Sequence, residues 1–170
     1  MRFLHSRARR GAVSDILIFA AIIGVIVAIL RFLPASDPLS VSGRPRLIDG
    51  DSLYVQGVEL RLIGIDAPEV AQNCSRNQVL WPCGMEATRA LRRFLGGASI
   101  ICEGREHDVH DRLLATCKIR GENVNRWMVE QGWAVSFHDY PAEERAARKA
   151  GRGIWSGSFV RPREWREDNR

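Results

Sequence analysis

The segment Asp49–Glu69 constrains the fold of this chain most strongly, because turn signals bound short apolar runs that also carry acidic residues and Arg61. It reads Asp-Gly-Asp-Ser-Leu-Tyr-Val-Gln-Gly-Val-Glu-Leu-Arg-Leu-Ile-Gly-Ile-Asp-Ala-Pro-Glu. The Asp-Gly and Ala-Pro pairs near its two ends predict strand, turn and strand. Paired strands can gather separated carboxylates, here Asp49, Asp51 and Asp66, at one rim, where a cation relieves their repulsion. The segment therefore predicts a site for a hard metal ion.

Charged residues in and beyond this segment have the chemistry that phosphodiester hydrolysis requires. The reaction needs a positioned water, a base that takes its proton, and positive charge near the phosphoryl oxygens. Asp51 and Asp66 could hold a divalent cation, and Glu69 is a candidate base. Arg61 and Arg112 could clamp the phosphate, because the planar guanidinium group matches its geometry.

Several motifs follow one another along the chain in a characteristic order. They are Ile48-Asp49-Gly50-Asp51-Ser52, Arg61-Leu62-Ile63-Gly64-Ile65-Asp66-Ala67-Pro68-Glu69, Asp111-Arg112, Val124-Asn125, Gly132-Trp133-Ala134 and Gly153-Ile154-Trp155. In order and spacing they resemble the staphylococcal nuclease (thermonuclease) family over roughly residues 43–157. The Arg-x4-Asp-x-Pro-Glu element together with Asp-Gly-Asp is the specific part of this resemblance.

The resemblance implies an OB-fold barrel with helices that binds Ca2+ and hydrolyses DNA and RNA to products ending in a 3′-phosphate. It assigns the two catalytic arginines to Arg61 and Arg112 and the general base to Glu69. It assigns the calcium ligands to the carboxylates of Asp51 and Asp66 and to the backbone carbonyl of Ala67, which replaces a common threonine.

The chain departs from the family pattern just before Arg112. A Tyr-Gly-Arg pattern is usual there, whereas this chain has Val109-His110-Asp111-Arg112. Asp111 can adopt a left-handed turn in place of glycine, although its charge lies next to the phosphate-binding arginine. His110 takes the place of the tyrosine and is expected to contact substrate, while Tyr140 and Phe137 could supply an aromatic wall for a base.

The hydrophobic pattern predicts an α+β, mainly β fold, in which five strands form a small closed or nearly closed barrel with about three helices. The resemblance implies that this five-stranded barrel is an OB-fold. The expected strands are Arg46–Ile48, Ser52–Val55, Val58–Asp66, Ser99–Glu103 and Leu113–Ile119, with a loop over Pro68–Pro82. The expected helices are Met85–Leu95, Val124–Gln131 and Ala142–Lys149.

The N-terminal region differs in composition from the rest of the chain. Four arginines and Asp15 give residues 1–15 a net charge of +3, so only +2 of the total of +5 falls on the remaining residues. Global charge is therefore weak support for a polyanion partner. Residues 16–33 are predicted to be a transmembrane anchor, since the uncharged run Ile16–Leu30 would span roughly 22 Å as a helix. A cleaved signal peptide is the alternative.

The positive-inside bias places residues 1–15 in the cytoplasm and the nuclease-like domain, residues 43–157, on the other side of the membrane, periplasmic or extracellular. Cleavage would make the protein secreted. Residues 34–42 are predicted to be a linker and residues 158–170 an arginine-rich surface tail. A monomer is expected, with nucleic acid and the membrane as partners.

Four cysteines fit an oxidising compartment, where an even number normally pairs. The pairs Cys74–Cys83 and Cys102–Cys117 are predicted, as one of three possible connectivities. Zinc binding requires tighter pairs than these spacings offer. Four free thiols would follow if the chain stays in the cytoplasm.

Two other functions remain open at this point. OB barrels also bind nucleic acid or other polyanions without cutting them, and the substituted segment Val109–Asp111 favours that alternative. A role in envelope assembly, with Trp165 and the tail docking a protein partner, is the third.

Overall fold

The computed structural model describes the fold of residues 6–32 and 37–169 of the 170-residue chain, and the side chains of residues 15–29, 31 and 37–169. The chain divides into two units, Met1–Ser36 and Asp37–Arg170. Residues 1–5 of the predicted basic N-terminus and residues 33–36 of the predicted anchor and linker lie outside the described residues.

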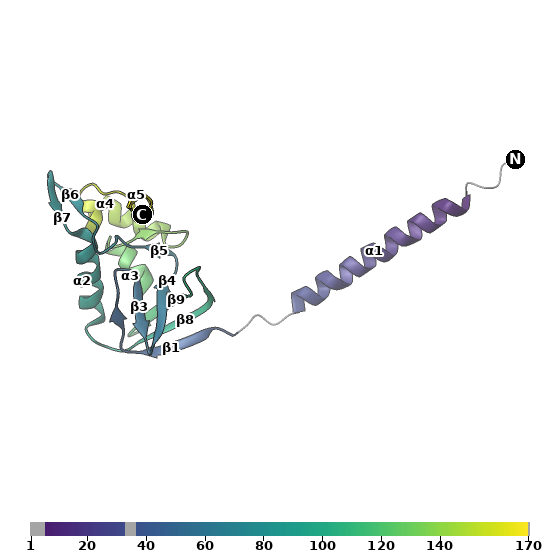
Figure 1. The fold of residues 1–170 in the computed structure, drawn as a ribbon, viewed down its shortest axis with the longest axis horizontal. Coiled ribbons are helices and arrows are strands. Elements are labelled where there is room, and N and C mark those ends of the chain that lie inside the picture. Colours follow the sequence, from purple (N-terminus) through teal and green to yellow (C-terminus); the bar gives the residue numbers. More distant parts are fainter. Residues whose placement is uncertain (1–5, 33–36, 170) are drawn as a thin grey trace. The chain divides into compact units, whose positions relative to one another are not determined.

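The first unit contains one helix, α1 (Ser6–Phe32), drawn in purple in Figure 1. Crossing a bilayer takes about 20 predominantly apolar helical residues. Among the residues that the structure describes, no helix is long and apolar enough to cross a membrane, so the predicted membrane anchor is not supported.

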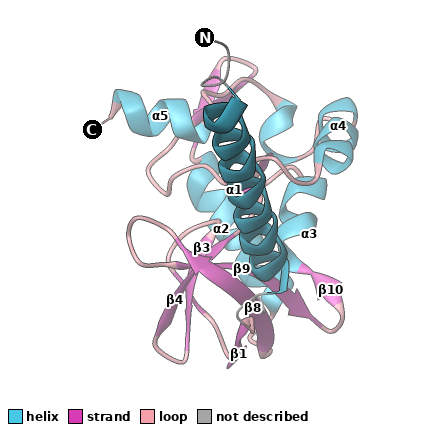
Figure 2. Ribbon diagram, turned by 90° about the vertical axis from the view of Figure 1, so that its right-hand side faces the viewer, coloured by secondary structure: helices cyan, strands magenta, loops and turns pink. Residues whose placement is uncertain are grey.

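The second unit is built on a sheet that has seven strands in its described residues, in the order β1-β8-β9-β4-β3-β2, with β10 beside β9. The strands are β1 (Leu39–Gly43), β2 (Arg46–Leu47), β3 (Ser52–Val55), β4 (Val58–Leu62), β8 (Ile100–His107), β9 (Leu113–Ile119) and β10 (Glu122–Asn123). Neighbouring strands are antiparallel, except that β4 and β9 are parallel. Figure 2 shows the sheet curling into a half-barrel of the OB type.

Four helices and a 3-10 turn accompany this sheet in the described part of the unit. They are α2 (Cys83–Leu95), α3 (Val124–Glu130), α4 (Pro141–Lys149), η1 (Gly153–Ser156) and α5 (Pro162–Asp168). Of these, α2, α3 and α4 are the three helices that the sequence predicts. The left-handed Gly96 ends α2, as its Gly-Gly pair indicates.

The core forms where the apolar face of α2 meets the sheet. Ala87, Leu91 and Leu95 recur at helical spacing and are buried together with strand residues such as Leu60 and Leu113. Burying one leucine side chain contributes about 2 kcal/mol, so this shared core fixes the strands whose ends carry the charged residues described below. The hairpin between β3 and β4 turns at Gln56-Gly57, where both residues have positive φ, 49° and 84°.

The strands differ from the sequence prediction in several places. The sheet has seven strands instead of five, and β1 begins at Leu39 inside the predicted linker, where Val41 is buried and pairs with Cys102. The predicted loop Pro68–Pro82 contains a hairpin of β6 (Cys74–Arg76) and β7 (Val79–Trp81). Both segments are rich in serine or other polar residues, so their composition did not predict strands. These strands depend on their pairing partners and not on local composition alone.

The region predicted as one strand over Val58–Asp66 is also divided in two. After β4 the chain turns at Ile63-Gly64 and continues as β5 (Ile65–Asp66), which pairs with β11 (Val135–Ser136) in a separate sheet. Gly64 has a φ of 80°, which interrupts the strand.

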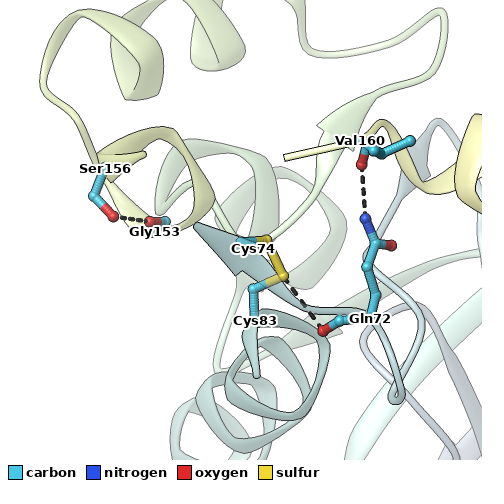
Figure 3. The surroundings of a disulfide bond; sticks show 6 residues. All are labelled: Gln72, Cys74, Cys83, Gly153, Ser156 and Val160. Atoms are coloured by element: carbon cyan, nitrogen blue, oxygen red, sulfur yellow. Dashed lines mark hydrogen bonds between the residues drawn. A yellow bond between two sulfur atoms is a disulfide. The ribbon is translucent and has the colours of Figure 1, made fainter. Parts of the chain in front are cut away.

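Both predicted disulfides are present, and no described cysteine is free. Cys102 and Cys117 are direct partners on β8 and β9. Cys74 joins the β6–β7 hairpin to Cys83 at the start of α2, and Figure 3 shows Gln72 beside this bond. The disulfides thus tie one pair of core strands together and tie a surface hairpin to α2.

We expect the double variant Cys102→Ala, Cys117→Ala to lose about 3 kcal/mol of unfolding free energy, because the bond closes a 15-residue separation in the unfolded chain. Urea unfolding of the oxidised wild type and the variant measures this difference. An unchanged midpoint would contradict the expectation, and reduced wild-type protein serves as the control for both bonds.

Candidate active site

Arg61 on β4 connects the two aspartates predicted to bind a cation. Its Nη2 donates to Oδ2 of Asp51 at 3.2 Å and to Oδ1 of Asp66 at 3.0 Å. The two aspartates are only 3% and 4% exposed. Among the described residues, no hydrogen bond is made by Nε or Nη1 of Arg61, so these groups can donate to a ligand.

The Asp-Gly-Asp turn before β3 orients Asp51. The Asp49 Oδ1 atom accepts the backbone N–H groups of Asp51 at 2.9 Å and Ser52 at 2.6 Å, as in a tight Asx turn. The backbone N–H of Ala67 donates to Oδ2 of Asp51 at 3.0 Å, which joins this turn to the end of β5. Burial and the nearby carboxylate of Asp51 raise the pKa of Asp49 to about 6.

Arg112 reaches the same group of residues from the start of β9. The parallel register places Leu60 beside Leu113, so Arg112 lies next to the strand that carries Arg61. Its Nη1 lies 3.3 Å from the Ser52 hydroxyl, which in turn donates to Oδ1 of Asp51 at 3.0 Å. A chain of polar contacts therefore runs from Arg112 through Asp51 to Arg61.

Asp108 holds the other side of the Arg112 guanidinium. Nε and Nη2 of Arg112 donate to its Oδ2 at 2.8 and 2.6 Å. Although burial acts to raise the pKa of Asp108, the hydrogen bonds from the side chain and backbone of Arg112 outweigh it and lower the pKa to about 2. Asp111 has a φ of 62° and lets the chain turn between the two residues.

Glu69 lies just past β5 and is held through its backbone. Its carbonyl oxygen accepts the N–H of Gln72 at 2.8 Å, and Gly84 of α2 packs directly against that carbonyl. A Cβ at position 84 would lie only 1.6 Å from the Glu69 oxygen, so only glycine allows this approach. The side chain of Glu69 is about one third exposed.

The C-terminal helix α5 adds an arginine to this site. Arg166 donates from Nη1 to Oε1 of Glu69 at 2.9 Å and from Nη2 to Oδ2 of Asp66 at 3.2 Å. Its Nη1 also lies 2.9 Å from Oδ1 of Asp66. The two carboxylates raise the pKa of Arg166 further above its usual value, although burial alone would lower it.

The pKa of Asp66 shows that the two arginines only partly compensate for the burial of its negative charge. Burial raises the pKa of Asp66, and the carboxylate of Asp51 adds to the effect; the hydrogen bond from Arg166 and the charge of Arg61 oppose it without cancelling it. Because the pKa of Asp66 remains raised beside two arginines, more positive charge would stabilise its ionised carboxylate further.

The donor chemistry at this point fits a hard cation. Asp51 and Asp66 accept from the same nitrogen atom of Arg61, so their oxygens can reach one small ion. Carboxylate and carbonyl oxygens are the ligands that Ca2+ prefers. Within the part of the chain that the structure describes, however, no group of three or more His, Cys, Asp or Glu side chains is arranged to hold a metal ion.

The side chains of the two predicted substrate contacts, Tyr140 and His110, make no hydrogen bond to Asp51, Asp66, Arg61 or Arg112 among the described residues. The Tyr140 hydroxyl accepts from Asn123 at 3.3 Å, and its ring packs on the core. The His110 side chain is exposed, while its backbone N–H donates to Asp108 at 2.9 Å. A cavity of about 360 Å3 adjoins Arg61 and is lined in part by the half-exposed Phe137.

Three residues of the site were not predicted from the sequence. Asp108 lies in the turn between β8 and β9, where its spacing to Arg112 gives no signal, because the i,i+4 rule holds for helices. Asn125 is fully buried, donates to the carbonyls of Ile63 and Ala115, and so fixes the turn between β4 and β5; it lies within one of the motifs noted above. Arg166 gave no signal, because it is one of several arginines in a polar tail.

Comparison with known proteins identifies the family of this chain. The family described as "Staphylococcal nuclease homologue" matches residues 59–157, which is more than half of the chain. The chain therefore belongs to the staphylococcal nuclease family.

The relatives of this chain carry different names. It is 33% identical over 159 residues to the succinoglycan biosynthesis protein ExoI of Rhizobium meliloti, covering 89% of this chain and 81% of that protein. It is 32% identical over 146 residues to the protein ParB of Escherichia coli, covering 73% and 77%. It is 31% identical over 133 residues to an uncharacterized endonuclease of Escherichia coli O157:H7, covering 71% and 81%.

We expect Asp49→Asn to raise the unfolding free energy at pH 7.5, by on the order of 2 kcal/mol, and to change it little near pH 4. The pKa of Asp49 is about 6 in the folded protein against 3.8 for an unperturbed aspartate. Above pH 6 the folded state therefore carries a charge that unfolding relieves, and this penalty disappears as pH falls from 6 towards 4. Asparagine keeps the Oδ1 acceptor of the turn.

Urea unfolding between pH 4 and 7.5 tests this, with Asp37→Asn, at an exposed position, as the matched control. A constant difference between Asp49→Asn and wild type across this range would show that Asp49 does not titrate as described.

Proposed function

We propose that this protein is a Ca2+-dependent nuclease that hydrolyses DNA, RNA or both to products ending in a 3′-phosphate. The polar network that links Arg112, Ser52, Asp51, Arg61 and Asp66 is the observation that supports this proposal. It gathers carboxylates and guanidinium groups from distant positions around one point. Family membership and the endonucleases among the relatives support it as well.

Asp51, Asp66 and the backbone carbonyl of Ala67 are the proposed ligands of the cation. When bound there, Ca2+ would neutralise the acidic residues and polarise a phosphoryl oxygen. The proposal assigns to Glu69 the removal of a proton from the attacking water, which its partly exposed side chain can reach from solvent. Water then attacks phosphorus in line, the P–O5′ bond breaks, and the departing oxygen takes a proton from solvent.

The two arginines stabilise the negative charge that develops on the phosphoryl oxygens. Arg61 presents its Nε and Nη1 groups, while Nη2 remains on the two aspartates. Arg112 is held in place by Asp108 and Ser52, so little side-chain entropy is lost when it meets substrate. Preformed donors of this kind stabilise a transition state more than flexible ones do.

We also propose that the nuclease domain works outside the cytoplasm, in the periplasm or the extracellular space. Its two disulfides support this location, because such bonds persist in oxidising compartments.

A second function is favoured by the pairing of Arg112 with Asp108. Two of the donor nitrogens of Arg112 are taken by this carboxylate, which reduces what the arginine can offer to a transition state. A barrel that binds nucleic acid without cutting it is therefore the alternative.

Glu69→Gln is expected to slow cutting of single-stranded DNA about 100-fold or more while the fold is retained, because the amide cannot accept the proton. The assay uses the full oxidised chain with Ca2+ and again with EGTA. Glu122→Gln on β10 is the matched control and should cut at the wild-type rate.

Loss of cutting in EGTA together with the slow Glu69 variant would support the calcium-dependent enzyme. Equal rates for the wild type and Glu69→Gln would refute the assignment of the base. A folded wild type that retards DNA in a gel without cutting it would support the binding barrel.

A further inference from the structure

The guanidinium group of Arg166 lies against the carboxylates of Asp66, a proposed cation ligand, and of Glu69, the proposed base. Its two terminal nitrogens meet both oxygens of Asp66, and one of them also meets Glu69. Oδ1 of Asp66 has a second arginine contact from Arg61 at 3.0 Å. Every carboxylate oxygen of Asp66 therefore already has a positively charged partner from the same chain.

A divalent cation and Arg166 compete for these oxygens. Ca2+ binds carboxylate oxygen at about 2.3–2.6 Å. At that distance it would lie close to the guanidinium group, and the two positive charges would repel each other in a site where both aspartates are nearly buried. Binding of the ion therefore favours withdrawal of the Arg166 side chain.

The helix that carries Arg166 is attached to the domain by other residues. The buried side chain of Gln72 donates to the Val160 carbonyl at 2.7 Å, as Figure 3 shows. Ser75 and Ser158 exchange backbone hydrogen bonds at 2.8 and 2.9 Å, and Pro162 is buried. The tail can therefore stay docked while Arg166 changes its rotamer.

The surroundings give the side chain room to leave. Arg166 is 32% exposed, and it lines the cavity of about 360 Å3 beside Arg61. Arginine has three flexible methylene groups, so its guanidinium can move into this space while the backbone remains in place.

We infer that Arg166 is a displaceable internal counter-ion that occupies the cation site and sets the Ca2+ concentration at which the site fills. The inference rests on the proposed Ca2+-dependent function. It adds a determinant of cation affinity that lies in the tail, outside residues 59–157 that match the family.

The test compares Ca2+ binding by the full oxidised chain and its variants, measured by calorimetry at pH 7.5 and about 0.15 M salt, where exposed charges are screened. Arg166→Gln removes the competitor and is expected to lower the Kd for Ca2+ about tenfold, because binding no longer has to displace a tethered cation. Arg163→Gln removes the same charge from the same helix.

Arg163 is exposed and pairs with Glu167 one turn away, so its variant should stay within about twofold of the wild-type Kd. Thermal unfolding gives a second readout. Without Ca2+, Arg166→Gln should melt below the wild type, since Asp66 and Glu69 lose a partner, and saturating Ca2+ should raise its melting temperature by more than that of the wild type.

Unchanged or weaker Ca2+ binding by Arg166→Gln would overturn the inference, and so would an equal gain in Arg163→Gln or a lack of Ca2+ binding by all three proteins. Nucleic-acid cutting, measured in parallel, separates this result from the proposed function. Tighter Ca2+ binding without any cutting would support the inference and refute the nuclease. Cutting by the wild type, together with an unchanged Ca2+ affinity in Arg166→Gln, would support the nuclease and refute the inference.

Discussion

The buried carboxylates of Asp51 and Asp66 are the constraint on which the site depends. A charged group removed from water requires compensation, and two like charges that share one site require more. Arg61 supplies part of it through a single nitrogen that bridges both aspartates, and Arg166 supplies more from the tail. The positions of the arginines thus follow from the position of the acids.

The curled sheet is what brings these groups together. Arg61 is on β4 and Arg112 precedes β9, and the parallel pairing of these strands puts the two arginines on neighbouring parts of the sheet. Asn125 holds the turn that separates β4 from β5, so Asp66 faces the same point. The apolar core under α2 therefore orients the charged side chains indirectly, by fixing the strands whose ends they occupy.

Much of this arrangement could be predicted from the sequence, since local patterns determine it. The alternating apolar residues of Leu113–Ile119 and the helical spacing in α2 give elements that match the structure closely. The acidic turn and Arg61 lie within one short segment whose order is informative by itself. Both disulfides followed from how the cysteines bracket their segments.

The remaining features depend on contacts that no local pattern encodes. Strand β1 is stabilised by β8, about 60 positions further along, and its own serines favour a linker. Arg166 meets Asp66 across 100 positions, and nothing in the tail distinguishes it from its neighbours. The run Ile16–Leu30 is apolar enough in sequence to suggest a membrane helix, but no described helix is long and apolar enough to cross a membrane.

The parallel pairing of β4 with β9 also has a consequence during synthesis. Ser52 and Arg112, which connect the two halves of the site, are 60 positions apart. A nascent chain that has not yet released β9 from the ribosome has no β4–β9 pair, and so lacks the second arginine beside the acidic turn. The site therefore assembles only after the chain has passed β9, whatever the order in which the earlier strands form.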